Sequence, residues 1–290
     1  MNYTIKNEQL TVPISSRGAD LQSLRTADGT EYLWQGDPAY WTSHAPNIFP
    51  YVARLTEGKY SLHGNEYGFG NHGLVRYEDL VADNISDRSI TFCLDANEET
   101  ERKYPFDFRY RIRYKLTGCR LVIQTAVENW GDETMYFAVG GHPGFNVPLD
   151  EGLDFSDYYL EFNEEAHPYR IFLADSGAVT PKQGVYELSG RRIPLHHDLF
   201  DHDAVVLQHA SRKVTLASER GSRSVTIAYP GFRYIGFWHK PKTDAPYICI
   251  EPWTSLPSRE GIIENLALQG DLISLPGGEK WSTEWWIGIR

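Results

Sequence analysis

The chain has 290 residues and carries 28 Lys and Arg against 39 Asp and Glu, a formal net charge of −11. This acidic balance argues against nucleic acid or an anionic membrane surface as the main partner, because both bind basic proteins. The chain opens without a charged, apolar leader and has no run approaching the ~18 apolar residues of a membrane span, so the expected location is cytoplasmic. Its three cysteines, Cys93, Cys119 and Cys249, lack metal-ligand spacing and suit a reducing compartment.

Period-two alternation is the main structural signal along the chain. Between Phe106 and Leu116 every even-numbered residue is apolar and most odd-numbered ones are polar, as in a half-buried antiparallel strand. The turn 117–120 leads into a second apolar run, 121–127, so the two runs predict a hairpin. Further short runs predict strands at 89–94, 158–162, 214–217, 224–229, 234–238, 247–251 and 281–289.

The rest of the pattern indicates an all-β protein. No segment shows a long helical stripe of apolar residues, and an aromatic content of 13% suits the faces of sheets. The charge-rich segment 95–103 is expected to be a solvated loop. No Gly- or Pro-rich linker and no internal repeat divides the chain, so residues 1–290 are predicted to form one domain, a large antiparallel β-sandwich with few helices.

Three segments supply candidate ligand-binding side chains. Arg54 closes a stretch with the sequence Asn-Ile-Phe-Pro, and the segment 71–76 contains His72 and Arg76. A guanidinium is a planar fork of donors for hydroxyls, carboxylate or phosphate, while a histidine can donate to a ring or anomeric oxygen. Trp238 has a ring that could stack on the apolar face of a sugar, although most tryptophans at strand ends are simply packed.

The most informative residues are Glu251 and His142. Glu251 is the lone carboxylate in the apolar run Ile-Cys-Ile-Glu-Pro-Trp, where desolvation is costly unless charges or hydrogen bonds hold it. His142 stands in Gly-Gly-His-Pro-Gly-Phe, a composition typical of a tight turn that another molecule can approach closely. Each residue alone also fits a structural role, but together they are the minimum pair for moving two protons. Unperturbed pKa values of about 4.3 for Glu and 6.5 for His favour an ionised Glu251 beside a protonated His142.

The run 196–203, His-His-Asp-Leu-Phe-Asp-His-Asp, is the main competing site, because six of its eight residues could ligate a metal. Its spacing matches no tetrahedral or facial-triad template, and neighbouring side chains of a strand point to opposite faces. The sequence therefore favours a surface loop without a metal, with Asp203 at the entrance of the strand 204–207. Cys249 is expected to share the sheet face of Glu251 as a small buried hydrophobe.

The order of these motifs resembles the aldose 1-epimerase (mutarotase) superfamily, in particular the branch of LacX-like proteins and hexose-6-phosphate 1-epimerases. The similarity covers nearly the whole chain. It implies a galactose mutarotase-like supersandwich with an open sugar cleft and neither metal nor organic cofactor. It also implies that Glu251 is the general base and His142 the general acid. His72 and Arg54 would be the sugar-oxygen and electrostatic partners, and Asp203 would hold sugar hydroxyls.

The expected function is an aldose 1-epimerase, an isomerase that interconverts the α and β anomers of an aldohexose. The alternatives are a hexose-6-phosphate 1-epimerase, in which Arg76 and Arg54 contact the phosphate, and a non-catalytic sugar-binding or sensing module on the same fold. The net charge of −11 disfavours a dianionic ligand. Galactose mutarotases have His-Gly-Gly where this chain has His72-Gly73-Leu74, which weakens the case for free galactose. A glycoside hydrolase normally needs two carboxylates, and only Asp203 could join Glu251.

Overall fold

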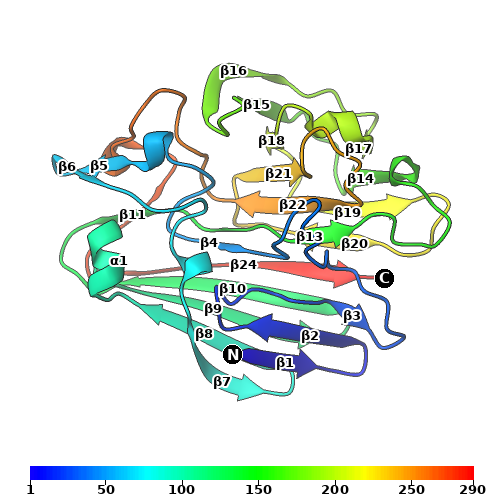
Figure 1. Ribbon diagram of the computed structural model, residues 1–290, viewed down its shortest axis with the longest axis horizontal. Helices are drawn as coiled ribbons and strands as arrows, with labels where there is room; N and C mark the ends of the chain where they lie inside the picture. The colour runs from blue at the N-terminus through cyan, green and yellow to red at the C-terminus, as the bar shows by residue number, and fades with distance from the viewer.

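The computed structural model describes residues 1–290, and antiparallel strands make up most of its regular structure (Figure 1). The largest sheet has nine strands, which are in spatial order β17 (Arg192–Pro194), β14 (Tyr158–Phe162), β19 (Lys213–Ser218), β20 (Val225–Ala228), β24 (Lys280–Ile289), β10 (Arg120–Asn129), β9 (Phe108–Thr117), β8 (Ser89–Asp95) and β7 (Val81–Ser86). The eight-stranded sheet contains β16 (Val179–Val185), β15 (Tyr169–Leu173), β18 (Val205–Gln208), β21 (Tyr234–Trp238), β22 (Tyr247–Trp253), β12 (Gly140–Gly141) and β4 (Asn47–Ile48), with β13 (Gly144–Asn146) also paired to β22.

Smaller elements cover the edges and ends of these sheets (Figure 1). They are a three-stranded sheet of β1 (Asn2–Lys6), β2 (Leu10–Ser15) and β3 (Arg25–Thr26), and the strand pairs β5 (Tyr60–Leu62) with β6 (Asn65–Tyr67) and β11 (Met135–Phe137) with β23 (Ile273–Leu275). The helical elements are α1 (Glu98–Lys103) and the 3-10 turns η1 (Thr56–Gly58), η2 (Val75–Tyr77), η3 (Phe155–Asp157), η4 (His197–Phe200) and η5 (Leu266–Leu268). None of the helices has the length and apolar character needed to cross a bilayer.

The two large sheets pack face to face. The rings of Phe162 on β14 and Phe237 on β21 have centroids 6.2 Å apart. The Trp285 ring of β24 lies so close to Gly141 of β12 that a Cβ atom on this glycine would come within 2.5 Å of it. Such contacts unite the inner faces in one core of 71 buried residues. The predicted antiparallel β-sandwich is therefore confirmed.

The strand predictions from period-two alternation are also confirmed. β9 and β10 form a hairpin that pairs Phe108 with Asn129 at one end and Thr117 with Arg120 at the other. Alternate residues of β9 are buried, which is the burial that its sequence pattern predicts. The remaining predicted strands correspond to β8, β14, β19, β20, β21, β22 and β24, with ends that agree to within two residues.

Two local predictions are wrong. The segment 95–103 is not a loop, since Glu98–Lys103 forms α1. Asn97 caps this helix by accepting hydrogen bonds from the backbone of Glu99 and Thr100, and the Thr100 hydroxyl accepts in return from the Asn97 N–H. Acidic residues in its first turn and basic residues in its last turn add a favourable interaction with the helix dipole.

The second wrong prediction is the tight turn at 140–145. This segment forms the short extended strands β12 and β13, both paired with β22, and His142 lies between them. Its glycines are required by close packing, as at Gly141, rather than by turn geometry. Because β12 and β13 both pair with β22, the connection that carries His142 lies beside Glu251. Every residue of β22 is buried, so the two side chains meet in the interior.

Candidate active site

A cavity of about 250 Å³ opens beside β22 and β21. The residues that the sequence singled out come from segments far apart along the chain, and the structure brings all of them together around this cavity. They are Arg54, His72, Arg76, His142, Asp203, Trp238 and Glu251. Their assignment to catalysis and binding remains a prediction, whereas their convergence on one cavity is an observed property of the fold.

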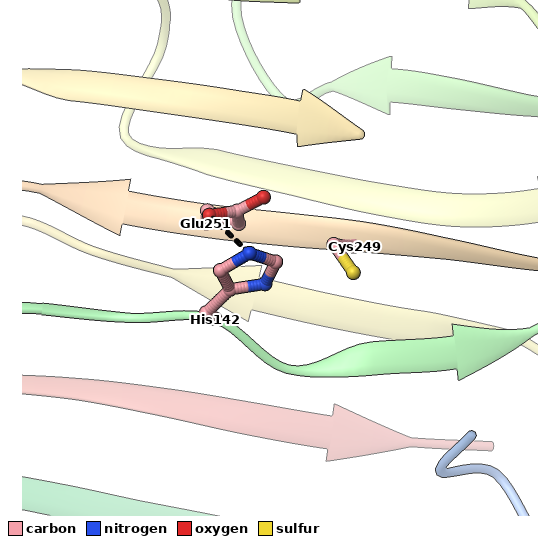
Figure 2. Close-up of side chains that lie close together, drawn as sticks. All are labelled: His142, Cys249 and Glu251. Atoms are coloured by element: carbon pink, nitrogen blue, oxygen red, sulfur yellow. Dashed lines mark ion pairs between the residues drawn. The ribbon is translucent and has the colours of Figure 1, made fainter. Parts of the chain in front are cut away.

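Glu251 is almost completely buried, with 1% of its surface exposed. Its Oε2 atom lies 3.3 Å from Nε2 of His142 and makes no hydrogen bond (Figure 2). Burial raises the pKa of Glu251 well above its usual value, the nearby charge of Asp203 adds to this rise, and Arg76 opposes it. Burial therefore favours the protonated form of this carboxyl group in the free protein.

His142 is 8% exposed and shares this environment. Its backbone N–H donates to the carbonyl of Pro46, which fixes the main chain between β12 and β13. Burial lowers the pKa of the imidazole to about 3, and the positive charge of Arg76 contributes to the decrease. The second ring nitrogen, Nδ1, is buried without a hydrogen-bond partner.

These shifts overturn the protonation expected from unperturbed pKa values. Burial disfavours both charged forms, so the shared proton of the free pair lies on Glu251 and His142 is neutral. The alternative arrangement, an ionised Glu251 beside a protonated His142, differs only in the position of one proton over 3.3 Å. A bound molecule that interacts better with the charged arrangement can therefore move that proton.

His72 is neutral and has a defined tautomer. Its Nδ1 accepts a hydrogen bond of 3.1 Å from the backbone N–H of Ala53. The proton of the neutral ring is consequently on Nε2, which makes this nitrogen a donor. Burial and the neighbouring His142 lower the pKa of His72 well below its usual value, so it stays neutral over the physiological range.

Strained backbone accompanies these side chains. Among the residues that line the cavity, Ala53, His72 and Asp203 have φ values of 49°, 64° and 72°, in the left-handed region that non-glycine residues rarely adopt. Each such residue costs about 1–3 kcal/mol, and strain of this kind concentrates at functional sites. Three of these residues around one cavity support a functional interpretation of the cavity.

Arg76 and Asp203 both contribute charge to the cavity wall. Arg76, on η2, donates to the Ser43 hydroxyl at 3.2 Å and also borders a neighbouring polar cavity of about 280 Å³. Asp203 accepts a hydrogen bond of 2.8 Å from the Ala204 N–H, and burial raises its pKa while the charge of Arg54 lowers it. The wall thus offers both a cationic donor and a carboxyl acceptor.

The structure adds seven lining residues to the candidates from the sequence, and three of the added residues, Trp41, Asn71 and Trp253, have polar side-chain atoms. Oδ1 of Asn71 and Nε1 of Trp253 are buried and have no hydrogen-bond partner. Trp253 could have been inferred, because it lies two residues after Glu251 and shares its face of β22. No pattern marked Trp41 or Asn71. Unpaired polar atoms around a cavity are available to the hydroxyl groups of a ligand.

The run 196–203 does not gather its side chains at one point. His196 contacts Asp198, whereas Nδ1 of His197 lies 3.1 Å from Nε2 of His239, and Asp203 lines the main cavity. Part of the run forms the 3-10 turn η4, in which Phe200 is buried. The expected surface loop is therefore partly regular and contributes one residue to the core.

A different set of possible metal ligands, His142, Cys249 and Glu251, has atoms within 4.8 Å of one another (Figure 2). Burial and the proximity of Glu251 raise the pKa of the Cys249 thiol. This residue therefore stays protonated and is a poor ligand, because metals bind the thiolate. It packs instead with Trp34 and Tyr247, as the small buried hydrophobe that the sequence predicted.

The chain is similar to known proteins over its whole length. The family model described as aldose 1-epimerase matches residues 1–284. The plasmid-encoded protein LacX of Lactococcus lactis subsp. lactis is 33% identical over 271 residues, which cover 88% of each chain. Two solved structures are similar in fold and sequence. A galactose mutarotase related enzyme from Lactobacillus acidophilus has a TM-score of 0.95 and 34% identity, covering 100% of this chain and 97% of its own. A galactose mutarotase-like protein from Lactobacillus casei has a TM-score of 0.93 and 31% identity, with 100% of both chains covered.

Proposed function

Because this chain belongs to the aldose 1-epimerase family, and is thus a carbohydrate epimerase, we propose that it interconverts the α and β anomers of an aldohexose. The observation that carries the proposal is the Glu251–His142 pair, with Oε2 and Nε2 3.3 Å apart in a cavity lined by further hydrogen-bonding groups. Opening a cyclic hemiacetal requires removal of a proton from the anomeric hydroxyl and addition of one to the ring oxygen. These two oxygens are bonded to the same carbon, so the acid and the base must be close together.

The reaction begins from the charged arrangement of the pair. Glu251 takes the proton of the anomeric hydroxyl while protonated His142 gives a proton to the ring oxygen, and the ring opens to the aldehyde. Rotation about the C1–C2 bond then presents the other face of the carbonyl, and reclosure with reversed proton movements gives the other anomer. No covalent bond to the protein forms.

The pKa shifts of the free protein fit this sequence of steps. A protonated Glu251 beside a neutral His142 is the arrangement that ring opening produces, so burial stabilises the pair in the form that accompanies the open-chain sugar. Arg76 lowers the pKa of Glu251 and thereby favours the ionised carboxylate needed to start. His72, with its proton on Nε2, is a second donor for the charge that develops on the sugar oxygens.

The function is tested with anomer-resolved NMR or polarimetry on a panel of free and 6-phosphorylated aldoses. Pure anomers are added, and approach to equilibrium is followed with and without protein. We expect acceleration of at least one aldohexose above the spontaneous rate. If the protein binds sugars but accelerates none of them, it is a sugar-binding or sensing module. Release of a sugar from glycosides would instead indicate a hydrolase that uses Glu251 and Asp203.

A second candidate substrate is a hexose 6-phosphate, and the observation that favours it is the presence of two guanidinium groups, Arg54 and Arg76, on one cavity. Against it, a cavity that shares Arg54 and Asp203 with this one adds two carboxylates, Asp175 and Asp201, and only one further cation, Lys242. This excess of acidic groups disfavours a dianion. The effect of Arg76→Ala on KM distinguishes between the two candidate substrates. For a phosphorylated substrate, KM should rise for the phosphorylated sugar and not for the free one. Equal effects on both would indicate that Arg76 acts on the ring or on the Glu251–His142 pair.

A further inference from the structure

The ring of His142 lacks the hydrogen bond that usually orients a catalytic imidazole. In most acid–base sites one ring nitrogen faces the reacting atoms and the other donates to a carboxylate or a carbonyl, which fixes the ring. Here Nε2 faces Glu251, but Nδ1 is buried and has no partner. Another contact must therefore determine the plane of this ring.

Aromatic packing provides that contact. The indole of Trp41 stacks on the imidazole of His142, with ring centroids 4.8 Å apart and an angle of 24° between the planes. The edges of His72 and Trp238 close two further sides, with centroids 5.0 and 5.7 Å away and angles of 80° and 85°. Tyr247 lies nearly parallel to Trp41, at 5.8 Å and 21°. The imidazole is thus the end member of a Tyr247–Trp41–His142 stack.

The position of Trp41 is itself fixed from outside the cavity. The Trp34 indole N–H donates to the Trp41 carbonyl at 2.7 Å, and the Tyr40 hydroxyl donates to Asp244 at 2.9 Å. Gly144, the first residue of β13 and two residues after His142, leaves room for the stack, since a Cβ atom there would lie 3.1 Å from both the Trp41 ring and Trp34. The sequence around His142 is therefore matched to the tryptophan that covers it.

We propose that Trp41 is the positioning residue of His142, whose indole face replaces the missing Nδ1 hydrogen bond, holds the ring toward Glu251 and stabilises the imidazolium during proton transfer. The inference rests on the proposed acid role of His142. An aromatic face attracts a cation, most strongly in a desolvated site. This attraction opposes the burial and the Arg76 charge that both disfavour the protonated ring.

The test compares Trp41→Leu with Trp41→Phe, and Trp130→Leu is the control. Trp34 is unsuitable as a control because its indole N–H holds the Trp41 carbonyl, whereas Trp130 is 45% exposed and does not line the cavity. We expect Trp41→Leu to lower kcat by about 10- to 100-fold, with KM changed less than about threefold, since a misplaced acid loses much of its contribution. Trp41→Phe keeps an aromatic face and should retain most of kcat, and Trp130→Leu should match the wild type.

The pH profile distinguishes positioning of the acid from a general loss of structure. If the indole stabilises the imidazolium, its removal shifts the basic limb of kcat to lower pH by about half a unit or more, because kcat reports the substrate complex in which His142 holds the proton. Trp41→Phe should show a smaller shift in the same direction. An unchanged profile, or a rise in KM with kcat preserved, would show that Trp41 is only part of the cavity wall and would overturn the proposal.

A measurement without substrate separates this inference from the proposed function. In protein labelled with ¹⁵N-histidine, the His142 ring nitrogens should show one tautomer in the wild type and in Trp130→Leu, and averaged shifts in Trp41→Leu. Unchanged His142 signals in Trp41→Leu would refute the positioning role even if activity falls. Altered signals in a protein that epimerises no sugar would leave the positioning role intact and refute the proposed function.

Discussion

Two buried histidines with aromatic neighbours, His142 and His239, show how burial alone differs from a functional environment. His239 is fully buried against Phe155 and Phe200, yet both of its ring nitrogens have partners. Nδ1 lies 2.8 Å from the carbonyl oxygen of Lys240 and Nε2 lies 3.1 Å from Nδ1 of His197. His142 has no partner at Nδ1, and its Nε2 faces a carboxyl group that also lacks a hydrogen bond.

The pKa values do not separate the two residues, because burial lowers the pKa of His239 to about 4 and that of His142 to about 3. The two histidines differ instead in whether their ring nitrogens have hydrogen-bond partners. Buried polar groups in folded proteins are nearly always paired, so an unpaired one marks either strain or a place for a ligand. His239 has completed its bonding within the protein, whereas His142 and Glu251 retain the capacity to exchange protons with a substrate.

The largest expected effect on the rate of anomerisation comes from substituting Glu251, the partner of His142. Glu251→Gln keeps the shape of the side chain but cannot accept a proton, so anomerisation should fall by about 10²- to 10⁴-fold. Because the carboxyl group is already neutral in the free protein, the variant should fold normally and its Tm should be close to that of the wild type. Anomer-resolved NMR gives the rate and thermal denaturation gives the Tm. A rate near that of the wild type would remove Glu251 from the mechanism.

His239→Gln should have the opposite outcome. The substitution disturbs a paired, fully buried ring, and leaving His197 without its partner should lower the free energy of unfolding by about 1–3 kcal/mol. The cavity does not include His239, so kcat of the folded variant should stay within a few-fold of the wild type. Denaturant unfolding and the same NMR assay measure both quantities. A large fall in kcat at temperatures where the variant is folded would contradict the structural role assigned to His239.

The difference between the two histidines could not be read from the sequence. Period-two alternation predicted the strands because it depends on local burial, and the residues flanking Glu251 indicated a carboxylate inside a buried strand. Whether a histidine is paired depends on contacts made across the fold, such as His197 with His239 or Trp41 with His142. The same reason explains the wrong protonation of the pair, since burial changes a pKa only after distant segments enclose it.

The lowered pKa of His239 makes the stability of the protein depend on pH. The pKa of His239 is lowered from 6.5 to about 4, so between these pH values the unfolded chain binds a proton that the folded protein does not. The contribution of His239 to the free energy of unfolding is thus fully present above pH 6.5 and decreases as the pH falls. The decrease is about 2 kcal/mol at pH 5. His142 acts in the same direction, while the raised pKa of Glu251 acts in the opposite one.

Comparing the wild type with His239→Gln isolates the contribution of His239. The variant should be less stable at pH 7.5, but its Tm should fall less steeply between pH 7.5 and pH 5. Thermal denaturation at closely spaced pH values measures the two slopes. Parallel curves would mean that His239 is protonated in the folded protein at pH 5, contrary to the effect of its burial.

The smallest expected effect concerns the run 196–203 beside His239. If its histidines served a metal, dialysis against a strong chelator would lower the Tm and the rate, and zinc would restore them. The geometry favours no change in either quantity. Nδ1 and Nε2 of His239 are taken by Lys240 and His197, His196 contacts Asp198, and Asp203 faces the cavity, so the donors do not converge on one point. A Tm loss that zinc reverses, with kcat of the remaining folded protein unchanged, would instead make the His197–His239 pair a structural metal site and leave the assignment of the cavity unaffected.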